Sequence, residues 1–282
     1  MAPELHHRSA MDSLAASAAA GLRSRIEALD LLAHNLANAQ TTAYKADREL
    51  YRVYETDESW ESTTGKLAPS ALPDVPDRWI DLRQGMLRET GNPLDVALEG
   101  PGYFLVMDRP PANAGAPPTG KSSPLLTRDG HFRLHPLPPA PGLPPNPARL
   151  ETADSRMVLD QNRAPIVVDS RLDINIDARG VVRQDGQERG RLALVQPAPT
   201  ALESPLKRAG NYFAFETSSP SMPVAPANPT VHQGRLESAN VEPAESAVRL
   251  IHVMRQFETL NRALQIGGEM SRKAVEEVAR IG

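Results

Sequence analysis

Apolar residues recur at steps of three and four at both ends of the chain, which is the spacing of one face of an α-helix. Near the amino terminus the stripe runs for about 26 residues from Met11, with one extra step of four, as in a coiled-coil seam with a stutter. Its apolar positions are Ala15, Ala18, Leu22, Ile26, Leu29, Ala33 and Leu36. We expect this helix to end between Asn38 and Thr42, where short polar side chains compete for backbone hydrogen bonds.

A second helix is predicted at the carboxyl terminus, with Asn240 as its N-cap, Pro243 in its first turn and an end near Val278. Its seam positions are Ala247, Leu250, Met254, Phe257, Asn261, Leu264 and Gly268. Asn261 is a polar residue at a seam position, which fixes register in coiled coils. Both ends of the chain therefore need an apolar partner.

Between the helices the period changes to two, which predicts short β-strands. Strands are expected at residues 94–99, 103–107, 156–160, 165–168, 172–176, 180–183, 191–196 and 211–215, and a hairpin at 124–134 around Asp129-Gly130. Many short strands between turns are typical of an antiparallel sandwich or barrel. The fold class is therefore α+β, with terminal helices that pair as a coiled-coil layer and a central, mostly antiparallel β domain.

The chain divides into six segments on this interpretation. We expect a disordered extension at 1–10, the first helix and a following turn at 11–45, an extended connection at 46–90, the β domain at 91–219, a Pro-rich return linker at 220–239 and the last helix at 240–282. Two Pro-rich loops, 109–124 and 136–147, interrupt the β domain and should be polyproline-like. The start of translation is open between Met1 and Met11.

Composition and charge exclude several classes of protein. The chain has 282 residues, a net charge of −4 and no cysteine, so it offers no disulfide or thiolate site and no basic surface for nucleic acid or anionic lipid. No stretch approaches the roughly 18–20 apolar residues of a transmembrane helix. The small-residue run at 14–22 imitates a secretory signal, but its apolar spacing continues into the following helical turns.

Two motifs suggest chemistry that their context does not support. GAPPTGKS at 115–122 matches a phosphate-binding loop, but Pro124 and a turn follow where the motif requires a helix. His131 and His135 stand near Asp129, yet on a strand the two imidazoles would lie about 13 Å apart and could not share one ion. We therefore expect no nucleotide, no metal, no other cofactor and no catalytic site.

Three segments together resemble a known family. AHNLANAQTTAYK at 33–45 is similar to the signature of bacterial flagellar rod and hook proteins. TGNPLDVALEGPGYFLV at 90–106, followed by LLTRDGHFRL, resembles the central segment of the rod proteins, and VHQGRLESANVEPAESAVRLIHVMRQFE at 231–258 resembles their carboxyl-terminal segment. The three segments occur in the family's order.

The resemblance implies a structural protein rather than an enzyme. Family members are exported by the flagellar type III apparatus without a cleaved signal, and their terminal helices form a layer that lines the axial tube of the basal-body rod. The partners implied are copies of the chain, other rod and hook proteins and the export apparatus, with no nucleic acid, no small-molecule substrate and no membrane insertion. The signature residues matched are Ala33, Asn35, Leu36, Ala37, Asn38, Thr41, Tyr44 and Lys45. We expect the subunit interface to use Leu22, Ile26, Leu29, Ala33, Asn35, Leu36, Asn38, Thr41, Tyr44, Leu250, Met254, Phe257, Asn261 and Leu264.

The chain departs from the family pattern at His34, Gln40 and Ala43. Ala43 stands where the family often has glycine, so it would be strained if the backbone there adopts a positive φ. A start at Met11-Asp12-Ser13 and the tail 269–282 favour the proximal over the distal rod protein. A distal rod or hook-type subunit remains the alternative within the family, and a secreted β-sandwich adhesion module with a helical stalk is the alternative from another class.

Overall fold

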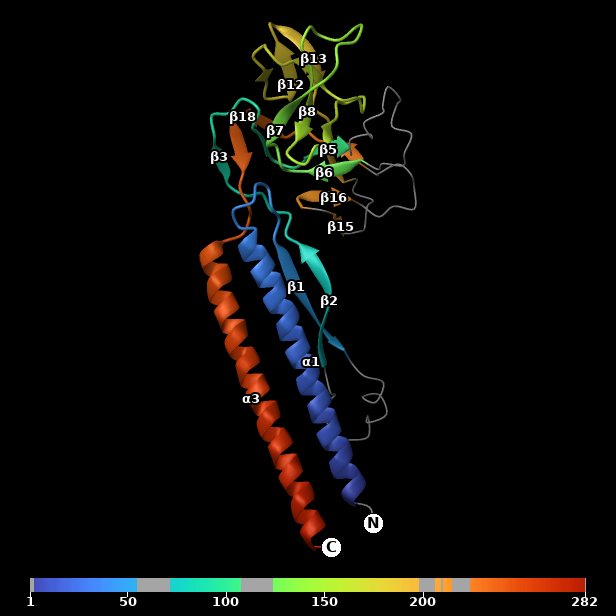
Figure 1. Cartoon of the computed structure of the whole chain (residues 1–282), viewed down its shortest axis with the longest axis vertical. Coiled ribbons are helices and arrows are strands. Elements are labelled where there is room, and N and C mark those ends of the chain that lie inside the picture. Colours follow the sequence, from blue (N-terminus) through green and yellow to red (C-terminus); the bar gives the residue numbers. More distant parts are fainter. Residues whose placement is uncertain are drawn as a thin grey trace. The chain divides into compact units, whose positions relative to one another are not determined.

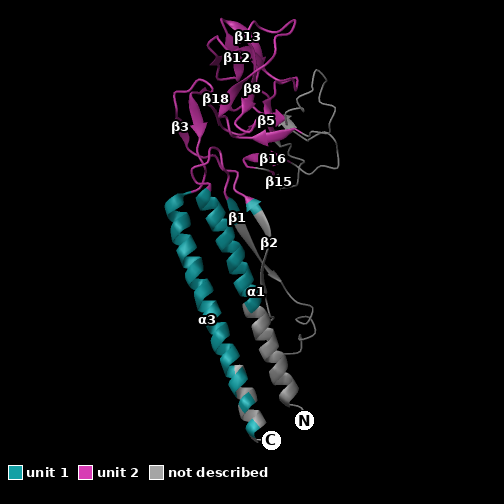
Figure 2. Ribbon diagram, in the orientation of Figure 1, with its two compact units in different colours: residues 1–37, 47–79, 242–282 teal, residues 38–46, 80–241 magenta. Residues whose placement is uncertain are grey.

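The computed structural model of the chain describes residues 3–54, 72–107, 124–197, 206–208, 210–214 and 224–281. The chain divides into two compact units (Figure 2). The helical unit comprises Met1–Ala37, Asp47–Trp79 and Glu242–Gly282, and the β unit comprises Asn38–Ala46 and Ile80–Val241. The chain therefore crosses from one unit to the other several times, and each unit contains segments that are distant in sequence.

Two long helices make up most of the helical unit. Helix α1 (Pro3–Ala37) and helix α3 (Pro243–Ile281) lie side by side and run in opposite directions (Figure 1). Ala28 and Leu32 of α1 and Val253 of α3 form their buried core. Among the side chains that the structure describes, Leu29 and Leu250 also pack against this core.

The ends of the helices differ from the expected ones. Helix α1 begins at Pro3, so residues 3–10 are helical and the predicted disordered extension at 1–10 is wrong for them. It ends at Ala37, directly before the polar series that was expected to end it. Helix α3 begins at Pro243, later than a start directly after an N-cap at Asn240 would give, and continues beyond Val278 to Ile281.

Residues 46–90 contain regular strands that the sequence did not reveal. Strands β1 (Asp47–Tyr54) and β2 (Leu72–Ile80) form a two-stranded sheet, and β3 (Leu87–Glu89) follows. The strands in the described part of this segment have partners, so that part is more than a connection.

The β unit is built from short antiparallel strands, as expected. After β3 they are β4 (Val96–Glu99), β5 (Tyr103–Met107), β6 (Leu125–Thr127), β7 (Phe132–Pro136), β8 (Pro147–Thr152), β9 (Met157–Val158), β10 (Val167–Asp169), β11 (Asn175–Ile176), β12 (Val181–Gln184), β13 (Gln187–Arg191), β14 (Leu194–Pro197), β15 (Leu206–Lys207), β16 (Tyr212–Ala214), β17 (Val224–Pro226), β18 (Thr230–Gln233) and β19 (Arg235–Glu237). The α+β class is confirmed.

One ten-stranded sheet carries most of the β unit. Its order is β10-β8-β9-β5-β6-β16-β15, with β7 paired to β8 and with β14 paired to both β5 and β17. Smaller sheets are β11-β12-β13, β4-β18 and β3-β19. Phe104 and Phe132 meet edge to face in the main core, with ring centroids 5.1 Å apart, and are almost fully buried.

Two predictions about strand pairing are wrong. The strands of the expected 124–134 hairpin exist, but β6 pairs with β5 and β16 whereas β7 pairs with β8. The expected return linker at 220–239 contains β17, β18 and β19, which pair with β14, β4 and β3. Because these partners are distant in sequence, local turn signals could not reveal them.

The Pro-rich segment 136–147 contributes its two ends to β7 and β8 and forms the loop between them. Residues 108–123, which include most of the other Pro-rich loop, lie outside the described part of the chain. Neither α1 nor α3 has, within the residues described, a stretch apolar and long enough to span a bilayer.

Candidate functional site

The family-like signature at 33–45 is divided between the two units. Its first part is the last turn of α1, where the buried Asn35 holds the start of β1 within the helical unit. The Asn35 amide donates to the carbonyl of Asp47 at 2.7 Å and accepts from the Asp47 amide at 3.1 Å. The Asn35 side chain thus makes the same two hydrogen bonds to Asp47 that a neighbouring strand would make. It fixes the point at which the chain leaves the helix.

The second part of the signature is a tight turn that belongs to the β unit. The Thr41 amide donates to the carbonyl of Asn38 at 3.0 Å, and the Tyr44 amide donates to the carbonyl of Thr41 at 3.2 Å. Ala43 lies between them at φ 55, the left-handed conformation considered for this position. Its amide donates to the carbonyl of Glu237 at 2.8 Å, so the strained residue is held by β19.

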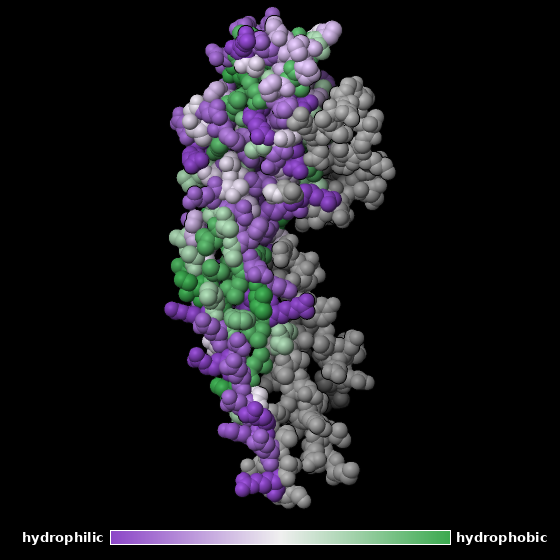
Figure 3. Space-filling model, viewed as in Figure 1, coloured by the Kyte–Doolittle hydropathy of each residue, from purple (hydrophilic) through white to green (hydrophobic). Residues whose placement is uncertain are grey.

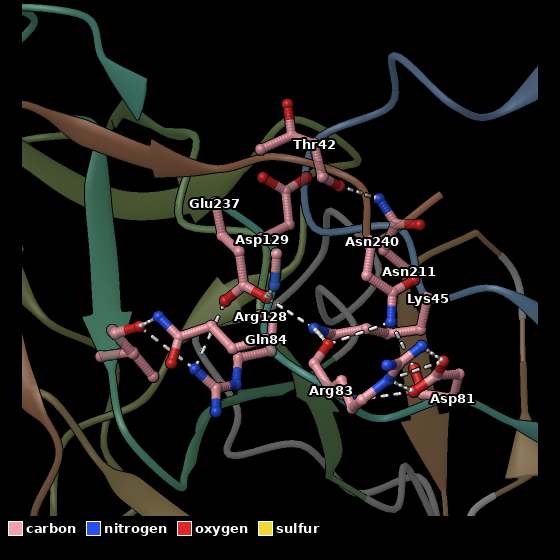
Figure 4. A network of polar contacts seen from close by, with 12 residues as sticks. Thr42, Lys45, Asp81, Arg83, Gln84, Arg128, Asp129, Asn211, Glu237 and Asn240 are labelled. Carbon is pink, nitrogen blue, oxygen red and sulfur yellow. Dashed lines mark hydrogen bonds and ion pairs between the residues drawn. The ribbon is translucent and has the colours of Figure 1, made fainter. Parts of the chain in front are cut away.

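A buried ion pair follows the turn (Figure 4). The Lys45 side chain is fully buried, and its ammonium donates to Glu237 Oε1 at 2.5 Å and to the carbonyl of Arg83 at 2.7 Å. Glu237 Oε1 also accepts from the amide of Gly85 at 3.0 Å. One carboxylate therefore joins three segments of the β unit that are far apart in sequence.

Arg128 approaches the other oxygen of the same carboxylate. Its guanidinium donates to Glu237 Oε2 at 3.3 Å and to the carbonyls of Leu98 and Gly100 at 3.2 and 2.5 Å. It also lies over the ring of Tyr103, 5.3 Å from the centroid. Two buried cations thus share the Glu237 carboxylate, and backbone carbonyls accept hydrogen bonds from some of their remaining N–H groups.

Burial dominates the electrostatics of this network. It lowers the pKa of Lys45, and the facing Glu237 carboxylate opposes that change. Burial likewise raises the pKa of the Tyr103 hydroxyl. An ammonium that is fully buried, hydrogen-bonded and paired fixes segments in place rather than exchanging protons with a substrate.

Asn240 has a different role from the predicted N-cap. Its amide group accepts from the backbone of Ala46 at 2.8 Å and donates to the carbonyls of Asp81 and Arg83 at 2.6 and 3.0 Å. The N-cap prediction is therefore wrong, because the side chain is used by two other segments of the β unit. Asn211 adds a further link, with its amide donating to the carbonyl of Thr42 at 2.5 Å.

Sequence reasoning matched Lys45 to the signature, but it considered Asn240 only as an N-cap and missed Glu237 and Arg128. Glu237, Arg128 and Asn240 lie in the two other segments that carried the family resemblance. In a sequence, an isolated carboxylate or arginine in a strand looks like a surface charge. Residues from the three segments that resemble the family meet in one network of hydrogen bonds and ion pairs. The presence of all three segments in one chain was the available sign that their polar residues belong together.

The predicted helix seams coincide only in part with the buried face, since Leu29 and Leu250 pack against the cluster of Ala28, Leu32 and Val253. On α1 the buried positions are Ser24, Ala28, Leu31, Leu32 and Asn35, whereas Leu22, Leu29 and Leu36 are half-buried and Ile26 and Ala33 are exposed. On α3 Val253 is buried, Leu250, Phe257 and Leu264 are half-buried, and Met254 and Asn261 are exposed. On α1 the fully buried positions therefore lie one residue, about 100°, from the predicted stripe, whereas on α3 much of the predicted stripe is half-buried.

The rotation leaves apolar side chains in solvent. Ile26 of α1 is 47% exposed, and on α3 the exposed fractions reach 69% for Val248 and 52% for Ile251. Met254, Ile266 and Met270 extend this set along α3. Figure 3 shows apolar side chains gathered over the first turns of α3. A protein rarely keeps such a stripe uncovered unless it is a contact surface.

The motifs for other chemistry give no shared site among the residues described. His131 Nδ1 lies 2.7 Å from Asp95, whereas His135 Nδ1 lies 4.0 Å from Glu151, so each imidazole faces a different carboxylate. No group of three or more potential metal ligands gathers in the described part of the chain. GAPPTGKS at 115–122 lies outside the residues described.

Comparison with known proteins defines the class. Residues 232–277 match the family model described as the flagellar basal body rod FlgEFG protein C-terminal region. The chain is 30% identical to the flagellar basal-body rod protein FlgF of Caulobacter vibrioides, over 90% of this chain and 92% of the relative. It is 28% identical to FlgF of Mesorhizobium japonicum, over 88% and 90% of the two chains. It is 24% identical to the rod protein FlgG of Caulobacter vibrioides, over 90% and 95%.

A relative of this similarity, covered along nearly its whole length, establishes the class as that of the structural proteins of the flagellar axis. The chain belongs to the flagellar basal-body rod protein family.

Proposed function

We propose that this chain is a structural subunit of the flagellar basal-body rod that assembles through the faces of α1 and α3 left in solvent. The observation that supports this proposal comes from the side chains that the structure describes: Ile26 of α1 and Val248, Ile251, Met254, Ile266 and Met270 of α3 stay exposed, while Ala28, Leu32 and Val253 form the buried cluster between the helices. Full burial of one such side chain against a neighbour contributes about 1.5–3 kcal/mol, so a few positions suffice to drive association.

The proposed interface has two groups of residues. The first lies on exposed or half-buried helix positions and comprises Leu22, Ile26, Leu29, Ala33, Leu36, Leu250, Met254, Phe257, Asn261 and Leu264. The second group is Asn35, Asn38, Thr41 and Tyr44 in the signature. Asn35 and Tyr44 are buried within the chain, so we assign them the shaping of the surface rather than direct contact. Thr41 is exposed and can contact a neighbour directly.

Within the family we favour the FlgF type, the proximal rod protein. The two relatives from Caulobacter vibrioides allow a comparison within one organism, and the chain is 30% identical to its FlgF but 24% identical to its FlgG. A distal subunit would use the same faces with different neighbours.

The proposal includes partners and a place in the cell. The chain would pack with copies of itself and with other rod and hook proteins, as a coiled-coil layer around the axis of the rod. It would reach that place through the flagellar export apparatus without a cleaved signal, and it would carry out no catalysis.

Fractionation tests this function directly. Hook–basal bodies are purified from cells that carry an epitope-tagged chain at its own locus, and a strain lacking the chain serves as the comparison. We expect the tagged chain in the basal-body fraction and loss of motility in its absence. Recovery on the cell surface, independent of flagella and with motility retained in the deletion strain, would favour an adhesion module instead.

A further inference from the structure

The Pro-rich loop at 137–146, between β7 and β8, has an unusually restricted backbone. Every residue from Leu137 to Asn146 except Gly142 is a proline or directly precedes one. Proline fixes its own φ, and it restricts the residue before it to extended conformations. The loop therefore consists of two polyproline-like arms joined at Gly142.

The joint is an ordered turn. The Leu143 amide donates to the carbonyl of Ala140 at 3.2 Å, and Gly142 has φ 84. Pro141 in the second position and a positive-φ glycine in the third define a type II β-turn. The arms are fixed at their bases as well, where Leu137 donates to the carbonyl of Pro147 at 2.7 Å and Ser170 donates to the carbonyl of Asn146 at 2.9 Å.

The surface that this loop presents is apolar and without charge. Residues 138–143 are all exposed, and Leu143 beside the turn is 38% exposed. The segment 136–147 contains no charged residue in a chain where 23% of residues are charged. Its seven prolines lack an N–H group, so the loop offers backbone carbonyl acceptors and apolar rings but few donors.

We propose that this loop is a docking element for a second protein that has a groove lined by aromatic side chains and N–H or O–H donors. The aromatic faces of the partner pack against the proline rings, and its N–H or O–H groups donate hydrogen bonds to the backbone carbonyls of the loop, as in other modes of polyproline recognition. Because the loop is preordered, binding costs little conformational entropy.

The described aromatic residues of this chain do not match the groove that the loop requires. Among the residues whose exposure the structure describes, Tyr44, Tyr103, Phe104, Phe132, Tyr212 and Phe213 are buried. Phe257 is half-buried, and Trp79, at 43%, is the exposed aromatic residue of that set. The described surface thus offers no pair of exposed rings for a proline-binding groove, so the inference commits to a different protein.

Photocrosslinking in cells tests the proposal with the full chain. A photoreactive phenylalanine analogue is placed at Leu143, and in the control at Gln187, the exposed first residue of β13. We expect an adduct with a different protein at Leu143 only, attached beside at least two aromatic residues. Alanine substitution of those partner aromatics should abolish it.

A second variant pair tests the role of the rigid arms. Pro138→Ala combined with Pro144→Ala should lower the adduct roughly tenfold because preorganisation is lost. Pro101→Ala, a change at an exposed proline outside the loop, should not lower it. Unaltered thermal unfolding of both variants shows that the fold is intact. An adduct with a second copy of the chain, an adduct with a non-protein molecule, or no adduct above the Gln187 level would each overturn the proposal.

Discussion

Lys45 is a fully buried cation whose position depends on Glu237. Taking both charges out of water is costly, and the pair offsets this cost because the carboxylate accepts from Lys45, Arg128 and the amide of Gly85. At the residue scale, the network therefore joins the signature turn, β19 and the segment after β6. The network fixes how these segments are arranged, and its net contribution to the free energy of unfolding is not large.

Glu237→Gln should lower the free energy of unfolding of the β unit by about 3–5 kcal/mol, because it leaves two buried cations unpaired. Adding Lys45→Met should recover part of this loss. Glu99→Gln, at a mostly exposed carboxylate beside His232, should change stability by less than about 1 kcal/mol and serves as the control. Hydrogen exchange of the β5 amides in the full chain measures these effects. Equal, small losses for both single variants would refute the role of Glu237.

Asp129 should make stability depend on pH. Burial raises its pKa to about 6, and Asp154 and Asp95 add to the effect while His131 opposes it. The folded chain then holds a proton that the unfolded chain releases above about pH 4, so stability should fall as the pH rises from about 4 to 6.

Asp129→Asn keeps the acceptor for the His131 amide and removes the charge. The variant should be more stable than the parent by about 2 kcal/mol at pH 7.5, with allowance for solvent screening, and equal to it at pH 3.5. Asp185→Asn, at an exposed turn, is the control. Chemical unfolding at the two pH values measures the difference. A gain of the same size at both values would show that the charge of Asp129 is not its cause.

Ala43 should tolerate glycine better than its neighbour Ala46. Both alanines are buried, but only Ala43 has a positive φ, which costs an L-residue about 1–2 kcal/mol. Ala46→Gly loses a buried methyl group and gains chain entropy in the unfolded state, whereas Ala43→Gly regains the strain energy. The two variants should therefore differ by about 1–2 kcal/mol in unfolding free energy. A larger loss for Ala43→Gly would contradict the assigned strain.

At the scale of elements, the existence of most strands and both helices could be predicted, but their partners could not. Strand β5 was predicted with its observed bounds because an apolar run follows two glycines. The run Val224–Pro226 looks like linker because prolines flank it, and only its pairing with β14 makes it a strand. Short strands depend on distant partners for most of their stability, so local sequence specifies them weakly.

The helix seam shows a second kind of limit. Helix α1 has apolar residues on two adjacent faces, one with Leu29 and Ala33 and one with Ala28 and Leu32. Periodicity gave the first face, while the structure packs the second against Val253. Both faces satisfy the helical repeat, so the pattern could not decide between them. The face that carries Ala33 is the one that we propose for contact with a neighbouring molecule.

The helices should be much less protected than the β unit in the isolated chain. Their buried core is Ala28, Leu32 and Val253, whereas the main β cluster contains Phe104, Phe132 and many other buried residues. Hydrogen exchange on dilute monomer should show rapid exchange through 15–36 and 247–270 and slow exchange in β5. Strong protection throughout both helical segments would contradict this expectation.

At the scale of the whole molecule, the chain separates a stable β unit from a helical unit with uncovered apolar faces. The central claim is that the exposed faces of α1 and α3 cause assembly. It requires that changes on these faces affect assembly without affecting the β unit.

Incorporation of matched variants into basal bodies tests this claim most directly. Ile26→Asn and Ile251→Asn place a polar group on the exposed apolar faces, and Arg23→Asn and His252→Asn change exposed polar positions on the same helices. Arg23 pairs with Glu27 only at the surface, so its loss should matter little. Each variant is expressed in cells lacking the parent chain and quantified in purified hook–basal bodies. The two apolar-face variants should be nearly absent, with the β unit still folded, while the two controls are present at the parental level. Incorporation of all four variants at that level would contradict the account.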